Sequence, residues 1–127
     1  MQMRSFAPMA VTVLALGAAA LGHESTALAG APFDGHWSVL IVTDAGTCDR
    51  AYRYALNIVD GRVTYDDPSF DVSGHVDARG HVSVSVSAGG ENASGSGQLS
   101  GNYGRGRWRG NSSASACSGH WEAERRG

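Results

Sequence analysis

Residues 69–88 read SFDVSGHVDARGHVSVSVSA, and their alternating pattern indicates the fold class. Apolar or small residues alternate with polar ones on both sides of the Ala-Arg-Gly turn at 78–80. Strict alternation is the period of a β-strand with one face turned to a core, and two such runs joined by a short turn form a hairpin. The stretch therefore predicts two antiparallel strands with one shared face turned to the core and the other turned to solvent.

The same alternation continues in both directions along the chain, interrupted by turn residues such as Asp60-Gly61 and Gly89-Gly90. The expected strands are 35–43, 51–59, 62–66, 69–77, 80–88, 92–101, 103–110 and 117–126. Every connection is short, so strands that follow one another in sequence should pair in space as an all-β, up-and-down antiparallel meander. We expect a single small closed eight-stranded barrel, since closure removes the sheet edges. A two-sheet sandwich is the alternative.

The first 29 residues have the organisation of a secretory signal peptide. A short start ending at Arg4 is followed by an apolar run over 6–22 and by the small-x-small tripeptide at 27–29. The sequence predicts cleavage after Ala29, a β-barrel domain over 30–127, and a secreted or periplasmic protein with no stable membrane anchor. The alternative is a membrane-spanning anchor, but the run is at the lower limit of spanning length and lacks a basic stop-transfer flank.

The two cysteines, Cys48 and Cys117, suggest one disulfide, because an even count in an exported chain usually pairs. Free thiols or a redox pair are the alternatives, but no Cys-x-x-Cys spacing is present. In an up-and-down barrel, the loop after the first strand and the start of the last strand lie at the same end of neighbouring strands. The bridge would therefore clamp the seam where the barrel closes.

The triplet Gly35-His36-Trp37 opens the first strand, and the same triplet recurs at 119–121 near the inward-facing Arg125. These residues and the strand count resemble the closed end of lipocalin-like (calycin) barrels. The resemblance implies that Arg125 stacks on the indole of Trp37 and bonds to carbonyl groups at the chain end. The length and single disulfide are similar to avidin-sized barrels and to small periplasmic inhibitors of secreted metalloproteases. The stretch 33–126 also resembles small exported bacterial proteins of unassigned function.

Composition and motifs argue against several kinds of chemistry. Ten Arg and no Lys stand against twelve acidic residues, a formal net charge of −2, which disfavours general nucleic-acid binding. There is no nucleophile, zinc-protease or phosphate-loop motif, so we expect neither an enzyme nor a cofactor. The histidine pairs His36/His120 and His75/His81 would supply two ligands each, fewer than a zinc site needs, so no metal is expected.

Four glycines on the predicted inner face, Gly95, Gly97, Gly104 and Gly106, remove side chains from two adjacent strands. Either they leave a cavity or large rings fill the space, since an eight-stranded barrel can be filled or can hold one small molecule. The aromatic residues that would line such a pocket are Trp37, Tyr52, Tyr54, Phe70, Trp108 and Trp121.

An outward basic stripe, Arg105, Arg107 and Arg109, has two interpretations. It is an anion-binding face, or acidic residues on the last strand neutralise it. If Trp108 faces Trp121 in the last hairpin, Arg107 opposes Glu122 and Arg105 opposes Glu124, which favours neutralisation.

For function, the sequence favours a small non-enzymatic binding module for an apolar or aromatic ligand entering at the disulfide end. The alternatives are a protein-binding barrel, such as a periplasmic protease inhibitor, and a structural envelope protein with a filled core. The identity of the partner and the oligomeric state are left open.

Overall fold

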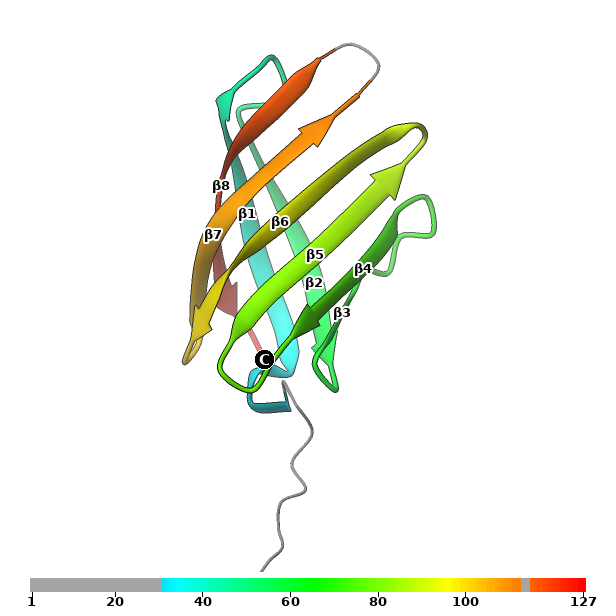
Figure 1. The fold of residues 1–127 in the computed structure, drawn as a ribbon. Helices are drawn as coiled ribbons and strands as arrows, with labels where there is room; N and C mark the ends of the chain where they lie inside the picture. Colours follow the sequence, from blue (N-terminus) through cyan, green and yellow to red (C-terminus); the bar gives the residue numbers. More distant parts are fainter. Residues whose placement is uncertain (1–30, 113–114) are drawn as a thin grey trace, which may run out of the picture.

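The alternating pattern forms eight strands that pair in chain order into a closed antiparallel barrel, so the predicted topology is confirmed (Figure 1). The structure, a computed structural model, describes residues 31–112 and 115–127. The predicted signal peptide, residues 1–29, lies outside the described residues. Among the residues described, no helix is long and apolar enough to cross a membrane.

The element bounds follow the sequence pattern closely. A 3₁₀ turn, η1, covers Ala31–Phe33. The strands are β1 Gly35–Ala45, β2 Ala51–Val59, β3 Arg62–Thr64, β4 Asp71–Val76, β5 His81–Ala88, β6 Glu91–Ser100, β7 Tyr103–Asn111 and β8 Ala116–Arg125. The largest differences from expectation flank the β3–β4 connection, where both strands are shorter than predicted. There Asp67 accepts hydrogen bonds from the backbone N–H (2.9 Å) and the hydroxyl (2.6 Å) of Ser69, so a side-chain-stabilised turn replaces ladder pairing.

Hairpin geometry follows the turn residues. Asp60 and Gly61 take φ values of 53° and 76°, and Gly89 and Gly90 take 57° and 87°. Positive φ at both central residues gives the two-residue turn whose twist matches that of the flanking strands. The Asp60–Gly61 turn is also tied to the residue before β1, because the carboxylate of Asp34 accepts hydrogen bonds from both backbone N–H groups at 2.7 and 3.0 Å.

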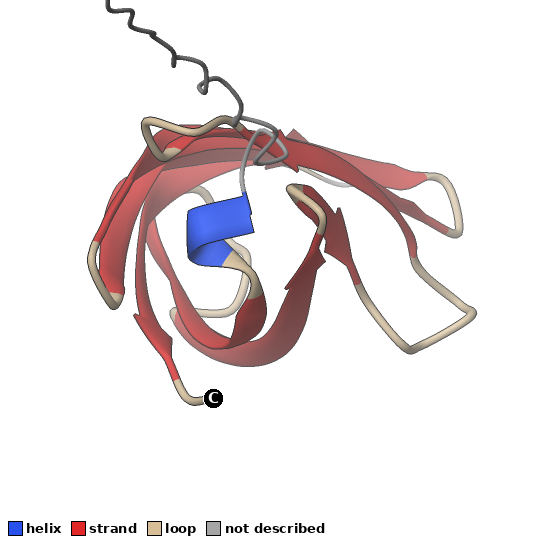
Figure 2. Cartoon of the chain, turned by 90° about the horizontal axis from the view of Figure 1, so that it is seen from below, coloured by secondary structure: helices blue, strands red, loops and turns tan. Residues whose placement is uncertain are grey.

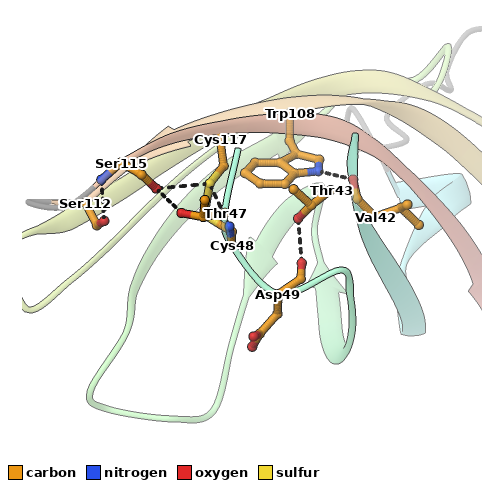
Figure 3. Close-up of a disulfide and its surroundings, with 9 residues drawn as sticks. All are labelled: Val42, Thr43, Thr47, Cys48, Asp49, Trp108, Ser112, Ser115 and Cys117. Carbon is orange, nitrogen blue, oxygen red and sulfur yellow. Dashed lines mark hydrogen bonds between the residues drawn. A yellow bond between two sulfur atoms is a disulfide. The ribbon is translucent and has the colours of Figure 1, made fainter. Parts of the chain in front are cut away.

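The barrel closes between β1 and β8, from Trp37 opposite Arg125 to Ala45 opposite Ser118, with a shift of register between Thr43 and Ala45. The predicted disulfide joins Cys48 to Cys117 at this seam, with their Cα atoms 6.2 Å apart. The loop that carries Cys48 is also held by buried Thr43, whose hydroxyl donates to the Asp49 carbonyl at 2.6 Å (Figure 3). Covalent and hydrogen-bonded contacts therefore fix the same corner.

At the opposite end, η1 lies inside the outline of the barrel (Figure 2). Trp37, 2% exposed, donates its indole N–H to the Phe33 carbonyl at 2.9 Å, and Phe33 packs against the core. The Arg125 guanidinium lies 5.2 Å from the centroid of the Trp37 ring and donates to the carbonyls of Pro32 and Asp34 at 3.1 and 2.8 Å. This end is thus closed by one arginine bound to the chain's own carbonyl groups.

We expect Arg125→Ala to lower the free energy of unfolding by about 2 kcal/mol, because it removes charge-assisted hydrogen bonds together with a cation–π contact. The neighbouring Arg126→Ala is the matched control. It removes only a surface ion pair with Glu124, so it should cost less than about 0.5 kcal/mol. Denaturant unfolding of both variants measures the difference. Equal, small losses would show that Arg125 does not hold this end closed.

Candidate functional site

The six aromatic residues predicted to share a pocket fall into separate places. Trp37 and Trp121 lie in the buried core, 2% and 7% exposed. Tyr52, Tyr54 and Phe70 instead belong to an aromatic group at the disulfide end, described below. The structure therefore does not bring all six to one surface.

Trp121 resolves the question of the four inner glycines, because its indole lies across all of them. A Cβ atom built on Gly97 or Gly106 would lie 2.5 or 2.6 Å from the ring, and one on Gly104 or Gly95 would be 3.4 or 3.7 Å away. The indole N–H donates to the Ser96 carbonyl at 3.2 Å. The glycines thus make room for a ring that fills this part of the interior.

Trp108 also lies opposite a glycine. It pairs with Gly119 on β8, and its indole N–H reaches across to the Val42 carbonyl of β1 at 2.9 Å, beside the disulfide (Figure 3). The predicted pairing of Trp108 with Trp121 is therefore wrong by two residues, since Gly106 is the residue opposite Trp121. Each indole lies opposite a glycine because two bulky rings side by side would overfill so narrow a barrel.

A second set of inward-facing residues remains partly exposed. We call Tyr52, Tyr54, Tyr65 and Phe70 the aromatic cluster; they come from β2 and the β3–β4 connection. Tyr54 is at the centre, with its ring centroid 4.9 Å from that of Tyr52, 5.9 Å from Tyr65 and 6.3 Å from Phe70. The Tyr65 and Phe70 rings meet edge to face at 5.4 Å. These are the tilted geometries that aromatic quadrupoles favour.

The cluster is accessible to solvent. Tyr52 is 52% exposed, and the other three rings are half-buried. Burial raises the pKa of the Tyr54 phenol, and the neighbouring Tyr52, Tyr65 and Asp49 raise it further. Tyr54 is therefore neutral at physiological pH and presents a ring with a hydroxyl that can donate a hydrogen bond.

Inward-facing residues near the cluster share its partial exposure. Val72 on β4, Val84 and Val86 on β5 and Ala93 on β6 are half-buried, whereas Val76 and Leu99, farther along the same sheet, are 2% and 3% exposed. Along β4–β6, the inward-facing residues are thus more exposed beside the aromatic cluster than at Val76 and Leu99.

The histidines do not pair as the sequence suggested. His120 faces Val42 near the end of β1, whereas His36 is at its start. His75 faces Ser83, and His81 bonds instead to Asp77 at 3.0 Å. Within the described ranges, no group of three or more His, Cys, Asp or Glu side chains is arranged to hold a metal ion.

Comparison with known proteins finds no matching family model, and comparisons with curated proteins and with solved structures likewise find no match.

Proposed function

We propose that this protein is an exported, non-catalytic binding module that takes a small apolar or aromatic molecule against the aromatic cluster. The observation that carries the proposal is the partial exposure of inward-facing aromatic rings, Tyr52 above all. A ligand site is typically apolar with a few polar groups that set orientation. The cluster has this composition, since three of its four rings carry a hydroxyl.

The energetics favour a ligand at this place. Fully burying a large apolar side chain stabilises a protein by about 1.5–3 kcal/mol, so the solvent-exposed rings of the cluster contribute only part of that free energy. A ligand that covers Tyr52 and Tyr54 would recover the remainder. The turn at Asp67 supports this, because it fixes the connection that carries Tyr65 and Phe70 before any ligand arrives.

Export is part of the proposal. A disulfide between Cys48 and Cys117 persists in oxidising compartments, which agrees with the signal-peptide pattern in residues 1–29. The arginine bound over Trp37 at the closed end is consistent with a calycin-like plan, in which one end of the barrel is sealed and the other receives the ligand.

We expect the neutral dye N-phenyl-1-naphthylamine to bind saturably, with a rise in its fluorescence as it leaves water. Tyr54→Ala should weaken this binding about tenfold, because the central ring contributes apolar area and edge-to-face contacts worth about 1.4 kcal/mol. Titration followed by dye fluorescence and by quenching of tryptophan emission measures both effects. A Trp108→Phe variant identifies which tryptophan reports.

The matched control is Tyr103→Ala, which removes an equally large ring that is 63% exposed on β7, outside the barrel. Dye binding should be unchanged in this variant. A flat titration of the folded protein, or equal losses in the two tyrosine variants, would contradict the proposal and favour a protein partner at the loops.

A further inference from the structure

The outer face of β7 carries three arginines at alternate positions, Arg105, Arg107 and Arg109. Alternate residues of a strand point the same way and are about 7 Å apart, so the charges repeat regularly along one line. All three residues are exposed. In Figure 1 this strand runs along the front of the barrel between β6 and β8. We call these three residues the arginine stripe.

The expected cross-strand pairing of the stripe with acidic residues is reduced to one position, Arg105 opposite Glu122. Because the β7–β8 register differs by two residues from the predicted one, Arg107 faces His120 and Arg105 faces Glu122. Glu124 faces Tyr103 instead and pairs with Arg126 at 2.9 Å. In the part of the chain that the structure describes, no ion pair or side-chain hydrogen bond involves the arginine stripe.

Two carboxylates contact His120, the residue opposite Arg107. His120 binds Asp44 at 2.9 Å on one side, and its other ring nitrogen is 4.0 Å from Glu122. Glu122 is thus the acidic residue directly opposite the stripe, and it faces Arg105 alone. Arg107 and Arg109 have no carboxylate across either neighbouring strand, since Ser96 and Ser94 face them on β6.

Hydroxyl groups surround the basic line. Ser73, Ser85, Ser94, Arg109 and Ser118 form one continuous row across β4–β8. This row lines a depression of about 750 Å³, to which Asn92, Asn111 and one acidic residue, Asp71, also contribute. At the other end of the stripe Tyr103 projects its ring into solvent, 63% exposed. The face therefore combines three cations with many neutral hydrogen-bonding groups, one aromatic ring and, at the Arg109 end, one carboxylate.

We propose that this face binds a linear acidic polysaccharide. Guanidinium groups bind carboxylates through paired hydrogen bonds, so the arginine stripe offers three binding groups to a chain that carries repeated carboxylates. The serine and asparagine side chains match the sugar hydroxyls, and the ring of Tyr103 can pack against the apolar face of a terminal sugar. This site is on the outside of the barrel and is separate from the aromatic cluster.

Two other polyanions fit the face less well. Proteins that bind single-stranded nucleic acid use several aromatic side chains on which successive bases stack, and this face has Tyr103 alone. A membrane surface would favour apolar residues beside the cations, whereas Ser94, Ser96 and Ser118 flank the stripe. The chain's net charge of −2 also opposes adsorption to polyanions by charge alone.

The test is titration of the purified, oxidised protein with polygalacturonate by calorimetry, with neutral dextran and an oligothymidylate of equal charge as comparison probes. R105Q/R107Q/R109Q should weaken polygalacturonate binding at least about tenfold, as expected when three exposed charge pairs are lost together. R50Q/R62Q/R79Q removes the same charge from exposed positions outside the stripe and should change the affinity for polygalacturonate less than about twofold. Binding should also weaken as ionic strength rises.

Tyr103→Ala should weaken polygalacturonate binding severalfold while leaving the naphthylamine dye unaffected, which separates this site from the aromatic cluster. Equal losses in the two triple variants would overturn the proposal, since charge alone would then explain binding. Binding of oligothymidylate as tight as that of polygalacturonate would overturn the assignment to a polysaccharide, and so would equal binding of dextran. An absence of polygalacturonate binding at low ionic strength would overturn it as well.

Discussion

Replacing Cys48 and Cys117 together by Ser is expected to lower the free energy of unfolding by about 4 kcal/mol, because the bridge joins residues 69 positions apart in the sequence. For a domain of this size the loss corresponds to a fall of about 20 °C in the thermal midpoint. A small barrel buries too little surface to absorb a loss of this size easily.

The native state itself should survive the substitution, since the corner is held by more than the bridge. Thr43 bonds to the Asp49 carbonyl at 2.6 Å and, through its backbone N–H, to the Arg50 carbonyl at 2.9 Å. Thr47 donates to Ser115 at 3.1 Å beside the bridge. These hydrogen bonds hold the folded corner in place without the disulfide. The disulfide should therefore stabilise the protein mainly by restricting the unfolded chain.

Thermal unfolding with and without reductant measures this effect. Reductant should lower the midpoint of the natural protein to that of C48S/C117S and leave the variant unchanged. Thr47→Ala is the control, because it removes a neighbouring hydrogen bond but keeps the bridge, and it should cost less than about 1 kcal/mol. A natural protein indifferent to reductant would show that the bridge contributes nothing to stability.

The sequence predicts the strands, their order and the disulfide because each depends on local or topological rules. Alternation in GHVSVSVSA at 80–88 gives β5, and Asp60-Gly61 gives a hairpin turn. Once the strands pair in chain order and the barrel closes, the loop after β1 and the start of β8 lie at the same end of neighbouring strands. This arrangement brings Cys48 and Cys117 together. The alternation recurs in every strand, so the strand order is predicted correctly even where a strand boundary is wrong by one or two residues, as at the β3–β4 connection.

The interior could not be derived in the same way, because alternation gives the face of a residue but not its register against the next strand. A shift of two residues preserves every inward and outward position, so Trp108 opposite Trp121 and Trp108 opposite Gly119 satisfy the pattern equally. The volume available inside the barrel decides between these two registers. The glycine positions contain the information on register, because four glycines on two adjacent strands leave space for one indole. The register that places Trp121 in this space also determines which residues of β8 face the arginine stripe.

Trp121→Ala is expected to lower the free energy of unfolding by about 4 kcal/mol, the range for removing a large aromatic ring from a core. The ring is 7% exposed and covers Gly95, Gly97, Gly104 and Gly106, which have no side chains to move into the space. The surrounding strands are fixed by barrel closure, so the cavity should persist rather than collapse. The lost hydrogen bond to the Ser96 carbonyl adds to the cost.

Trp108→Ala is the matched control, because this ring also lies opposite a glycine and also donates to a carbonyl, but is only half-buried. It should cost about 2 kcal/mol, roughly half as much, because less apolar surface and a smaller void are involved. Urea unfolding of the two variants, with the fold checked by circular dichroism, gives both values. Equal losses, or a loss below about 1 kcal/mol for Trp121→Ala, would contradict a filled glycine face, because an indole in an already hollow interior would have few contacts to lose.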